Sequence, residues 1–556
     1  MRALAVLLLL TPFASAQTFE QRYQEFSKYI RRPTLNKRVK GIEFLAASGD
    51  VRALTTLAKV YGKPPAEPKD QTRYITASIA WDRFGEPEHV DAWEAWRTKF
   101  KKPRDAWLWY RALDVVTINR GPETAMRVIK GKKDNLFLRM AALHSVGVFH
   151  EPVILPLISE LLDKTKARGL ERSLLVEACG RALVRQVNEQ GTDEYRRAAL
   201  KLMKQFDLKE TPARTRWVLA RCFARIFKTE QVYLDSSEPW RILLRAEDAK
   251  RVKIDPRYAP PKRPSFVGIE ATGKRIVYVI DMSDSMCTPL NPREKQNIGP
   301  VSGTREKDDE KKKGDANPLK GEQGLDWKKI KNRFDAAREY LIRSLKSLEP
   351  DMEYCVIWFG SDADYFRSTP GLMKATQGQV MKTIGELRAI RPGPKGGNRP
   401  HGTLKGNTNI HGGFLRAFAL RGKTKAKRHA YVDAKTFDTG ADTIFLLSDG
   451  DPSWDDWAGT DSRDQGDRVG DPEMGGGGNQ NATSLNFPGP YARNRHLLED
   501  LQRMNLFRQV EVHCIGIGEA SRGYLSSLAN AGLGRVRMIG KGPSHRGTKR
   551  QDEKKQ

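Results

Sequence analysis

Two aspartates and three hydroxyl residues, spread over three distant segments, are the residues in this sequence best suited to chemistry. Asp281, Ser283 and Ser285 form the pattern D-x-S-x-S, Thr408 lies in GNTNIHGG, and Asp449 follows the run TIFLLS. Carboxylate and hydroxyl oxygens are ligands for hard divalent cations, and Mg²⁺ keeps several waters in such a site. The residue types therefore predict an all-oxygen metal site for Mg²⁺, with Mn²⁺ and Ca²⁺ as alternatives. We predict no catalytic residue and no organic cofactor.

The predicted metal shell is incomplete without an oxygen from outside the chain. Hydroxyls are weak ligands, and two carboxylates leave a divalent ion short of anionic donors. An Asp or Glu side chain of a partner protein would complete the shell. In the alternative interpretation Asp281 and the serines only cap turns and hold no metal. Buried carboxylates without a partner are costly, which favours the metal.

Alternating strand and helix patterns surround these residues and predict the elements that position them. Apolar, β-branched runs predict strands, and apolar residues at every third or fourth position predict helices. The strands are expected over 275–280, 354–359, 443–447, 510–517 and 536–539, and the helices over 327–348, 377–390, 410–420, 494–504 and 524–531. This alternation predicts an α/β fold with a doubly wound, mostly parallel sheet. Ligands bind such sheets at the carboxyl ends of the strands, where Asp281 and Asp449 are expected.

The three motif segments, in this order and strand context, resemble the von Willebrand factor type A (VWA) domain and its metal-ion-dependent adhesion site. All five motif positions match, and the resemblance covers roughly residues 265–540. It implies a Rossmann-like VWA domain, which we bound at 269–540. It further implies that the serines ligate the metal directly, the threonine directly when a ligand is bound, and the aspartates mostly through water.

Three long insertions distinguish this sequence from a minimal VWA pattern. They cover residues 293–326, 392–405 and 451–490, and all are expected at the ligand-binding edge of the sheet. They would set the identity of the ligand if ordered, although their composition also permits disorder. The third carries a group of aspartates for which a solvated loop is the favoured interpretation and a second cation such as Ca²⁺ the alternative: Asp455, Asp456, Asp461, Asp464 and Asp467.

Residues 17–250 have a different pattern, with apolar side chains at helical spacing and no convincing strand. In RVKGIEFLAASGDVRALTTLAKVY one helix stops near Gly49, and Asp50 is placed to cap the next. Repeated helix pairs of this kind resemble HEAT-type repeats, which imply a stack with an exposed concave face. An irregular helical bundle is the alternative. Four tryptophans at helical spacing are expected in its core rather than in a binding box: Trp93, Trp96, Trp107 and Trp109.

The two ends of the chain and a proline-rich segment complete the predicted organisation. Residues 1–16 have the charged start, apolar run and small-residue cleavage pattern of a secretory signal peptide. The segment IDPRYAPPKRPS predicts an extended linker over 251–268, and the composition of 541–556 predicts a basic, disordered tail. No later apolar run is long enough to span a bilayer. We therefore expect an exported protein (periplasmic, at the cell surface or extracellular) without a transmembrane anchor after signal cleavage.

The basic composition limits the classes of partner without naming one. Lys and Arg number 97 against 68 Asp and Glu, a formal net charge of +29. These basic residues are spread through helices and loops rather than gathered with aromatics, so we expect no nucleic-acid partner. The basic loops and the tail could still contact anionic polymers. The five scattered cysteines form no disulfide framework, although Cys179 and Cys222 could bridge neighbouring helices.

The sequence favours a binding module over an enzyme. It contains no P-loop, no G-x-S-x-G and no H-E-x-x-H motif. The leading hypothesis is an exported, metal-dependent adhesion or interaction module that captures an acidic residue of a partner protein. The alternative is a structural scaffold of an envelope assembly that uses the helical repeats. A hydrolase built on Cys287 and His411 ranks last, because no third residue is expected to orient that pair.

Overall fold

The computed structural model describes most of the chain outside the two ends and the three insertions. The described residues are 17–131, 134–147, 153–164, 167–246, 249–260, 263–290, 330–391, 403–404, 406–426, 428–461 and 485–539. The signal-peptide and tail predictions and the whole first insertion lie outside them. Within them an N-terminal helical region precedes a mostly parallel, seven-stranded sheet, which confirms the mixed α/β class expected from the sequence.

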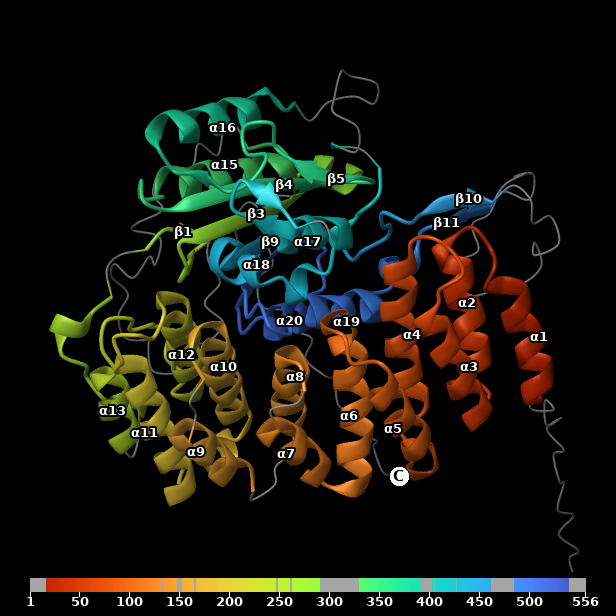
Figure 1. Cartoon of the computed structure of the whole chain (residues 1–556). Coiled ribbons are helices and arrows are strands. Elements are labelled where there is room, and N and C mark those ends of the chain that lie inside the picture. The colour runs from red at the N-terminus through yellow and green to blue at the C-terminus, as the bar shows by residue number, and fades with distance from the viewer. Residues whose placement is uncertain are drawn as a thin grey trace, which may run out of the picture.

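Short helices stand side by side in a row through the N-terminal region (Figure 1). They are α1 (Phe19–Tyr29), α2 (Leu35–Ala46), α3 (Val51–Gly62), α4 (Lys69–Arg83), α5 (Val90–Lys99), α6 (Ala106–Arg120), α7 (Glu123–Lys130), α8 (Leu136–Val146), α9 (Ile154–Lys164), α10 (Gly169–Arg185), α11 (Asp193–Asp207), α12 (Ala213–Ile226) and α13 (Glu238–Arg245). Local sequence sets their boundaries. Gly49 turns the chain with φ +67°, and Asp50 caps α3 by accepting from the backbone N–H of Arg52, as predicted.

Aromatic side chains fill much of the space between these helices. Trp93, Trp107 and Trp109 are at most 1% exposed. The ring of Trp96 packs edge-on against Trp93, with the ring centroids 5.0 Å apart. These positions confirm the interpretation of the four tryptophans as core residues. Truncating one buried aromatic of this size to alanine typically costs about 3–5 kcal/mol of stability.

The sheet has the order β13-β12-β9-β3-β4-β5, with β6 beside β4. Its strands are β3 (Arg275–Asp281), β4 (Glu353–Phe359), β5 (Ala363–Tyr365), β6 (Met373–Lys374), β9 (Thr443–Ser448), β12 (Glu511–Ile517) and β13 (Val536–Ile539). All pairings are parallel except those of β5 and β6 with β4. From β3 the chain continues to β4 on one side and later to β9 on the other. The strand order therefore reverses between β3 and β9, which is where α/β sheets bind ligands.

Helices cover both faces of this sheet, because successive side chains of a strand point to opposite faces. α15 (Arg333–Lys346) and α16 (Gln377–Ala389) pack over Ile276 and Tyr278. α17 (Ile410–Ala419), α19 (Asn494–Asn505) and α20 (Arg522–Ala531) pack over Val277 and Val279. The α/β part also contains smaller elements: β1 (Ser265–Phe266), β2 (Ile269–Glu270), β7 (Leu420–Arg421), β8 (Thr424–Lys425), α18 (Ala434–Thr439), β10 (Gly459–Asp461) and β11 (Leu485–Phe487).

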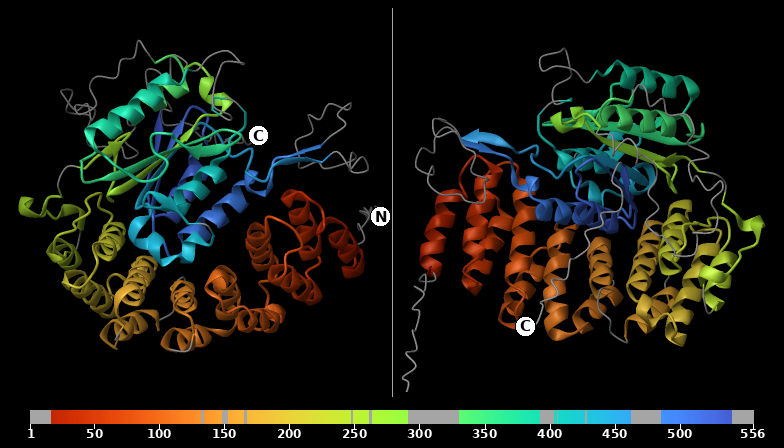
Figure 2. Two further views of the ribbon diagram at one scale, coloured as in Figure 1. Left: turned by 45° about the horizontal axis from the view of Figure 1, so that its top comes forward. Right: turned by 180° about the vertical axis from the view of Figure 1, so that it is seen from behind.

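The concave side of the helical row is filled by the α/β part of the same chain. Figure 2 shows the row curving around that part. Tyr431, Phe437, Tyr491 and Phe507 belong to the apolar cluster that the helices form. The Tyr431 hydroxyl also accepts from the backbone N–H of Trp107 at 3.4 Å. The exposed concave face implied by the HEAT resemblance is therefore not exposed here, because large aromatic side chains from the α/β part complete the core between the helices.

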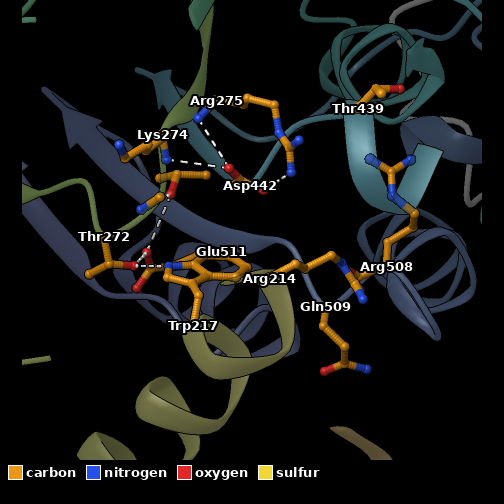
Figure 3. Close-up of polar contacts among 12 residues, drawn as sticks. Arg214, Trp217, Thr272, Lys274, Arg275, Thr439, Asp442, Arg508, Gln509 and Glu511 are labelled. Atoms are coloured by element: carbon orange, nitrogen blue, oxygen red, sulfur yellow. Dashed lines mark hydrogen bonds and ion pairs between the residues drawn. The ribbon is translucent and has the colours of Figure 1, made fainter. Parts of the chain in front are cut away.

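Buried polar contacts join the end of the helical row to the sheet (Figure 3). The Trp217 indole donates to Thr272 Oγ1 at 2.9 Å, and the Thr272 hydroxyl donates to the Glu511 carboxylate. Arg221 of α12 donates to the backbone carbonyl of Gln509 at 2.7 Å. Buried groups of this kind are stable only when each finds a partner. The helical region and the sheet thus form one packed unit in the described parts of the chain.

Two sequence predictions concern membranes and thiols. Across the described ranges, no helix combines the length and apolar character that a membrane span requires. All five cysteines are free thiols. Cys179 and Cys222 lie on the neighbouring helices α10 and α12, without the bridge that the sequence left open.

Candidate metal centre

The two aspartates of the motif lie at the carboxyl ends of adjacent parallel strands. Asp281 is the last residue of β3, and Asp449 directly follows β9. Ile280 pairs with Leu447 in the register of these strands, so both carboxylates emerge at the same level of the sheet edge. Asp281 and Asp449 are 0% and 2% exposed. The strand pattern of the sequence was sufficient to place them together.

Hydrogen bonds connect the two aspartates to the two serines of the motif. The backbone N–H of Ser283 donates to Asp281 Oδ1 at 2.9 Å. The Oγ atoms of Ser283 and Ser285 lie 3.0 Å apart, and Ser285 Oγ donates to Asp449 Oδ1 at 2.7 Å. A residue that the sequence did not single out, Ser448, donates to Asp281 Oδ2 at 2.7 Å. Hydrogen bonds therefore link four of the five predicted residues into one network.

Thr408 lies on a neighbouring loop that is fixed to this network through the backbone. The Asp284 N–H donates to the carbonyl of Gly406 at 3.2 Å. Thr408 itself exchanges two hydrogen bonds with Ser453, its N–H donating to Ser453 Oγ at 3.0 Å and its carbonyl accepting from the Ser453 N–H at 3.0 Å. Thr408 is thus held beside the D-x-S-x-S loop, at the amino end of α17.

Arg333 is a component of this centre that the sequence did not reveal. Its Nη1 atom lies 2.8 Å from Asp449 Oδ2, and the two side chains are 6% and 0% exposed. Gly518 follows β12 with φ +61°, and a Cβ there would overlap the Arg333 guanidinium. A glycine therefore leaves room for the arginine. In the sequence Arg333 is one basic residue within a helical pattern, and only the packing of α15 against the sheet brings it to Asp449.

The electrostatics of the centre disfavour two bare carboxylates. Burial, and next the negative charge of Asp449, raise the pKa of Asp281 to about 7. A nearby cation favours the ionised form of such a group. Arg333 supplies one positive charge to Asp449, while Asp281 accepts only neutral donors in the contacts above. The donor set of two carboxylates and two hydroxyls thus fits a hard divalent cation, which would offset the cost of burying Asp281.

The number of acidic side chains at this centre is small for a metal site. Among the described residues, no group of three or more His, Cys, Asp or Glu side chains is arranged to hold a metal ion. Asp284 and Ser285, unlike the buried Asp281 and Asp449, are exposed to solvent. The network therefore reaches the surface at Ser285, while both carboxylates are buried. A ligand from outside the chain can approach the oxygen network at that surface.

The aspartates of the third insertion lie in different environments. Asp455 is 1% exposed and accepts from the backbone N–H groups of Trp457 and Tyr491 at 2.7 and 2.8 Å. Burial raises the pKa of Asp455 to about 6. Asp456 pairs with Arg416 at 2.7 Å. Asp455 is therefore a buried capping group rather than part of a solvated loop, whereas Asp456 is exposed. Asp461 ends β10, and Asp464 and Asp467 lie outside the described residues.

The thiol and imidazole considered for hydrolysis lie on opposite faces of the sheet. Cys287 packs against the cluster under α15 and α16. His411 is on α17, where it is 0% exposed and pairs with Asp500 at 2.9 Å. Its ring stacks on Tyr491 with the centroids 3.7 Å apart. The sheet separates the two side chains, and the His411 imidazole is already paired with the buried Asp500 carboxylate.

No family model matches the sequence, and no curated protein matches it. A functional conclusion therefore depends on the chemistry of the oxygen network around Asp281 and Asp449.

Proposed function

We propose that this chain is an exported binding protein whose α/β region is a VWA domain, preceded by HEAT-like helical repeats. A divalent cation, Mg²⁺ first, is held by Asp281, Ser283, Ser285, Thr408 and Asp449 and captures an acidic side chain of a partner protein. The observation that carries this proposal is the hydrogen-bonded oxygen network at the reversal point of the sheet, formed by two buried aspartates and two serines.

Formal charge supports an anionic ligand at this centre. The ionised Asp281 and Asp449 with Arg333 carry a formal charge of −1, and one divalent ion changes this to +1. A single carboxylate from a partner would then bring the site to neutrality. Hard cations also prefer carboxylate oxygen over neutral donors. The exposed edge at Asp284 and Ser285 leaves room for such an approach.

The first test of the proposal is metal binding by the purified protein. Titration calorimetry with MgCl₂ alone should give a saturable signal that Asp281→Ala and Ser283→Ala remove. Asp284→Ala is the matched control, because Asp284 is exposed and lies between the two motif serines. A signal of the same size in all variants would place the metal elsewhere.

The second test is capture of a partner from envelope extracts with Mg²⁺ or with EDTA. A partner retained only with Mg²⁺, and lost in Asp281→Ala but not in Asp284→Ala, is the expected result. Capture that is indifferent to EDTA would contradict the proposal. It would instead favour a scaffold in which the outer surface of the helical row makes the contacts.

The scaffold alternative has one observation in its favour, the apolar core shared by the helices and the α/β part. A large, continuous core suits a rigid structural element. Deleting residues 17–250 does not separate the two functions, since it would expose Tyr431, Tyr491 and Phe507. The EDTA experiment on the intact chain separates them without that disruption.

A further inference from the structure

A cleft of about 700 Å³ lies where the end of α12 meets the edge of the sheet. Glu511 at the start of β12 and Arg535 just before β13 line it, so it is located at the amino ends of these strands. The oxygen network of Asp281 and Asp449 is at the carboxyl ends. The cleft is therefore on the opposite edge of the sheet and is independent of the proposed metal site. Its volume is in the range of small-molecule sites.

The walls of the cleft are positively charged. Four cations line it against two carboxylates: Arg221, Arg225, Lys228 and Arg535 against Glu230 and Glu511. Glu511 is already engaged by Arg221 at 3.5 Å and by His513 at 3.3 Å. Arg225 contacts the neutral side-chain oxygen of Asn530 at 3.4 Å. Among the residues that the structure describes, no carboxylate pairs with Arg225 or Lys228. Two exposed cations at the mouth are thus available to an anion.

Two residues that line the cleft have backbones that L-amino acids rarely adopt. Lys228 has φ +53° and Leu533 has φ +54°. Lys228 stands at the position after the end of α12 where glycine is usual, since the Thr229 N–H donates to the Ala224 carbonyl at 3.1 Å in the helix-terminating pattern. Strained residues of this kind collect at ligand sites. A lysine here costs stability and directs a charge to the mouth of the cleft.

Lys228 also lines a second hollow of about 390 Å³. Phe227, Leu243 and Leu244 line that hollow. Apolar side chains line the cleft beside its charged groups: Val184, Val187, Ala224, Val232 and Leu533. Exposed cations and apolar side chains in one cleft match a ligand that has both an anionic group and an apolar body.

We propose that this cleft binds a small organic anion, an apolar body that carries a phosphate or a carboxylate. Arg225 and Lys228 bind the anionic group at the mouth, and the valines and Leu533 pack against the body. Arg221 is a positioning residue, because it donates to the Gln509 and Gly532 carbonyls and holds the sheet edge against α12. Figure 3 shows Gln509 and Glu511 on this edge, beside α12.

The test is calorimetric titration of the full-length protein with octyl phosphate, octanoate, octanol and inorganic phosphate. We expect at least one amphipathic anion to bind about tenfold or more tightly than octanol and inorganic phosphate, because only the amphipathic probes contact the cations and the apolar lining together. The tighter of octyl phosphate and octanoate identifies the anionic group. Equal binding of octanol, or no binding of either anion at millimolar concentration, overturns the proposal.

Variants locate the binding of the tighter anion. Lys228→Gly and Arg225→Gln should each weaken it about tenfold, while Lys382→Gln, on the exposed surface of α16, should not. Glycine suits the backbone at position 228, so lost binding there cannot reflect unfolding. Unchanged affinity in both cleft variants overturns the proposal. Sedimentation with phosphatidylglycerol vesicles, without binding of the monomeric anions, would also overturn it, because the ligand would then be a lipid surface.

Discussion

The Arg333 guanidinium lies 2.8 Å from Asp449 Oδ2, and both side chains are almost completely buried. Arg333 supplies a fixed positive charge to a centre of two carboxylates. Asp281, the other carboxylate, accepts from a backbone N–H and from the Ser448 hydroxyl. Arg333 therefore neutralises the negative charge of Asp449, and a metal ion would neutralise that of Asp281.

Replacing Arg333 should make stability depend on the metal. Arg333→Met leaves Asp449 buried without its partner and should lower the free energy of unfolding by about 3–5 kcal/mol in EDTA. Mg²⁺ should recover part of this loss and stabilise the variant more than the parent, as thermal unfolding with and without Mg²⁺ would reveal. Arg338→Met is the control, since Arg338 pairs with Asp335 at 2.9 Å within α15. If Mg²⁺ stabilises the Arg333 and Arg338 variants equally, Arg333 does not neutralise Asp449 in the way proposed.

The pH dependence of stability should include a contribution from Asp114. Burial raises the pKa of Asp114 to about 6, although the charge of Arg111 and the Ser145 hydroxyl act in the opposite direction. The folded chain then holds a proton that the unfolded chain loses near the ordinary pKa of 3.8. The contribution of Asp114 to the free energy of unfolding therefore falls by roughly 3 kcal/mol as the pH rises from about 4 to about 6.

Urea unfolding of the parent and Asp114→Asn at several pH values measures this contribution. The variant should lack the fall between pH 4 and 6, so the difference between the two proteins should change across that window and stay constant above it. A constant difference throughout would mean that Asp114 titrates as it does in the unfolded chain.

Unfolding should be a single cooperative event for the helical row and the sheet. Phe507 is 1% exposed, and its ring centroid lies 5.3 Å from that of Phe137 on α8. Phe507→Ala should cost about 3–4 kcal/mol and shift one common transition in calorimetry. Met381→Ala, at a half-exposed side chain, should change stability by less than about 0.5 kcal/mol. Two separate transitions, only one of them moved by Phe507→Ala, would disprove a shared core.

Two backbone positions should respond to substitution with opposite signs. Lys228→Gly should raise the free energy of unfolding by roughly 0.5–1 kcal/mol, because glycine adopts φ +53° without a steric penalty. Gly518→Ala should lower it by about 1–3 kcal/mol, since the new Cβ is strained at φ +61° and collides with Arg333. Chemical denaturation of both variants checks the signs. A loss of stability in Lys228→Gly would mean that contacts of the lysine outweigh its backbone strain.

Local patterns in the sequence determined the strands and the ends at which their polar residues lie. The apolar run before Asp281 and the run before Asp449 are buried parallel strands, and parallel strands bring their carboxyl ends to one edge. The cap at Asp50 follows from a single side chain and the turn before it. Such features depend on neighbours in the chain, so periodicity and residue type are enough to predict them.

Tertiary structure alone decided which charged and aromatic groups complete these elements. Arg333 reaches Asp449 only because α15 packs across the end of β3 and Gly518 leaves space for its side chain. Tyr431 and Phe507 close the concave side of the helices from distant parts of the chain, as the contact of Tyr431 with Trp107, 324 residues earlier, illustrates. Contacts between distant segments depend on which surfaces meet after folding. No local periodicity carries that information, because the same side chain is compatible with a solvated surface and with a buried interface.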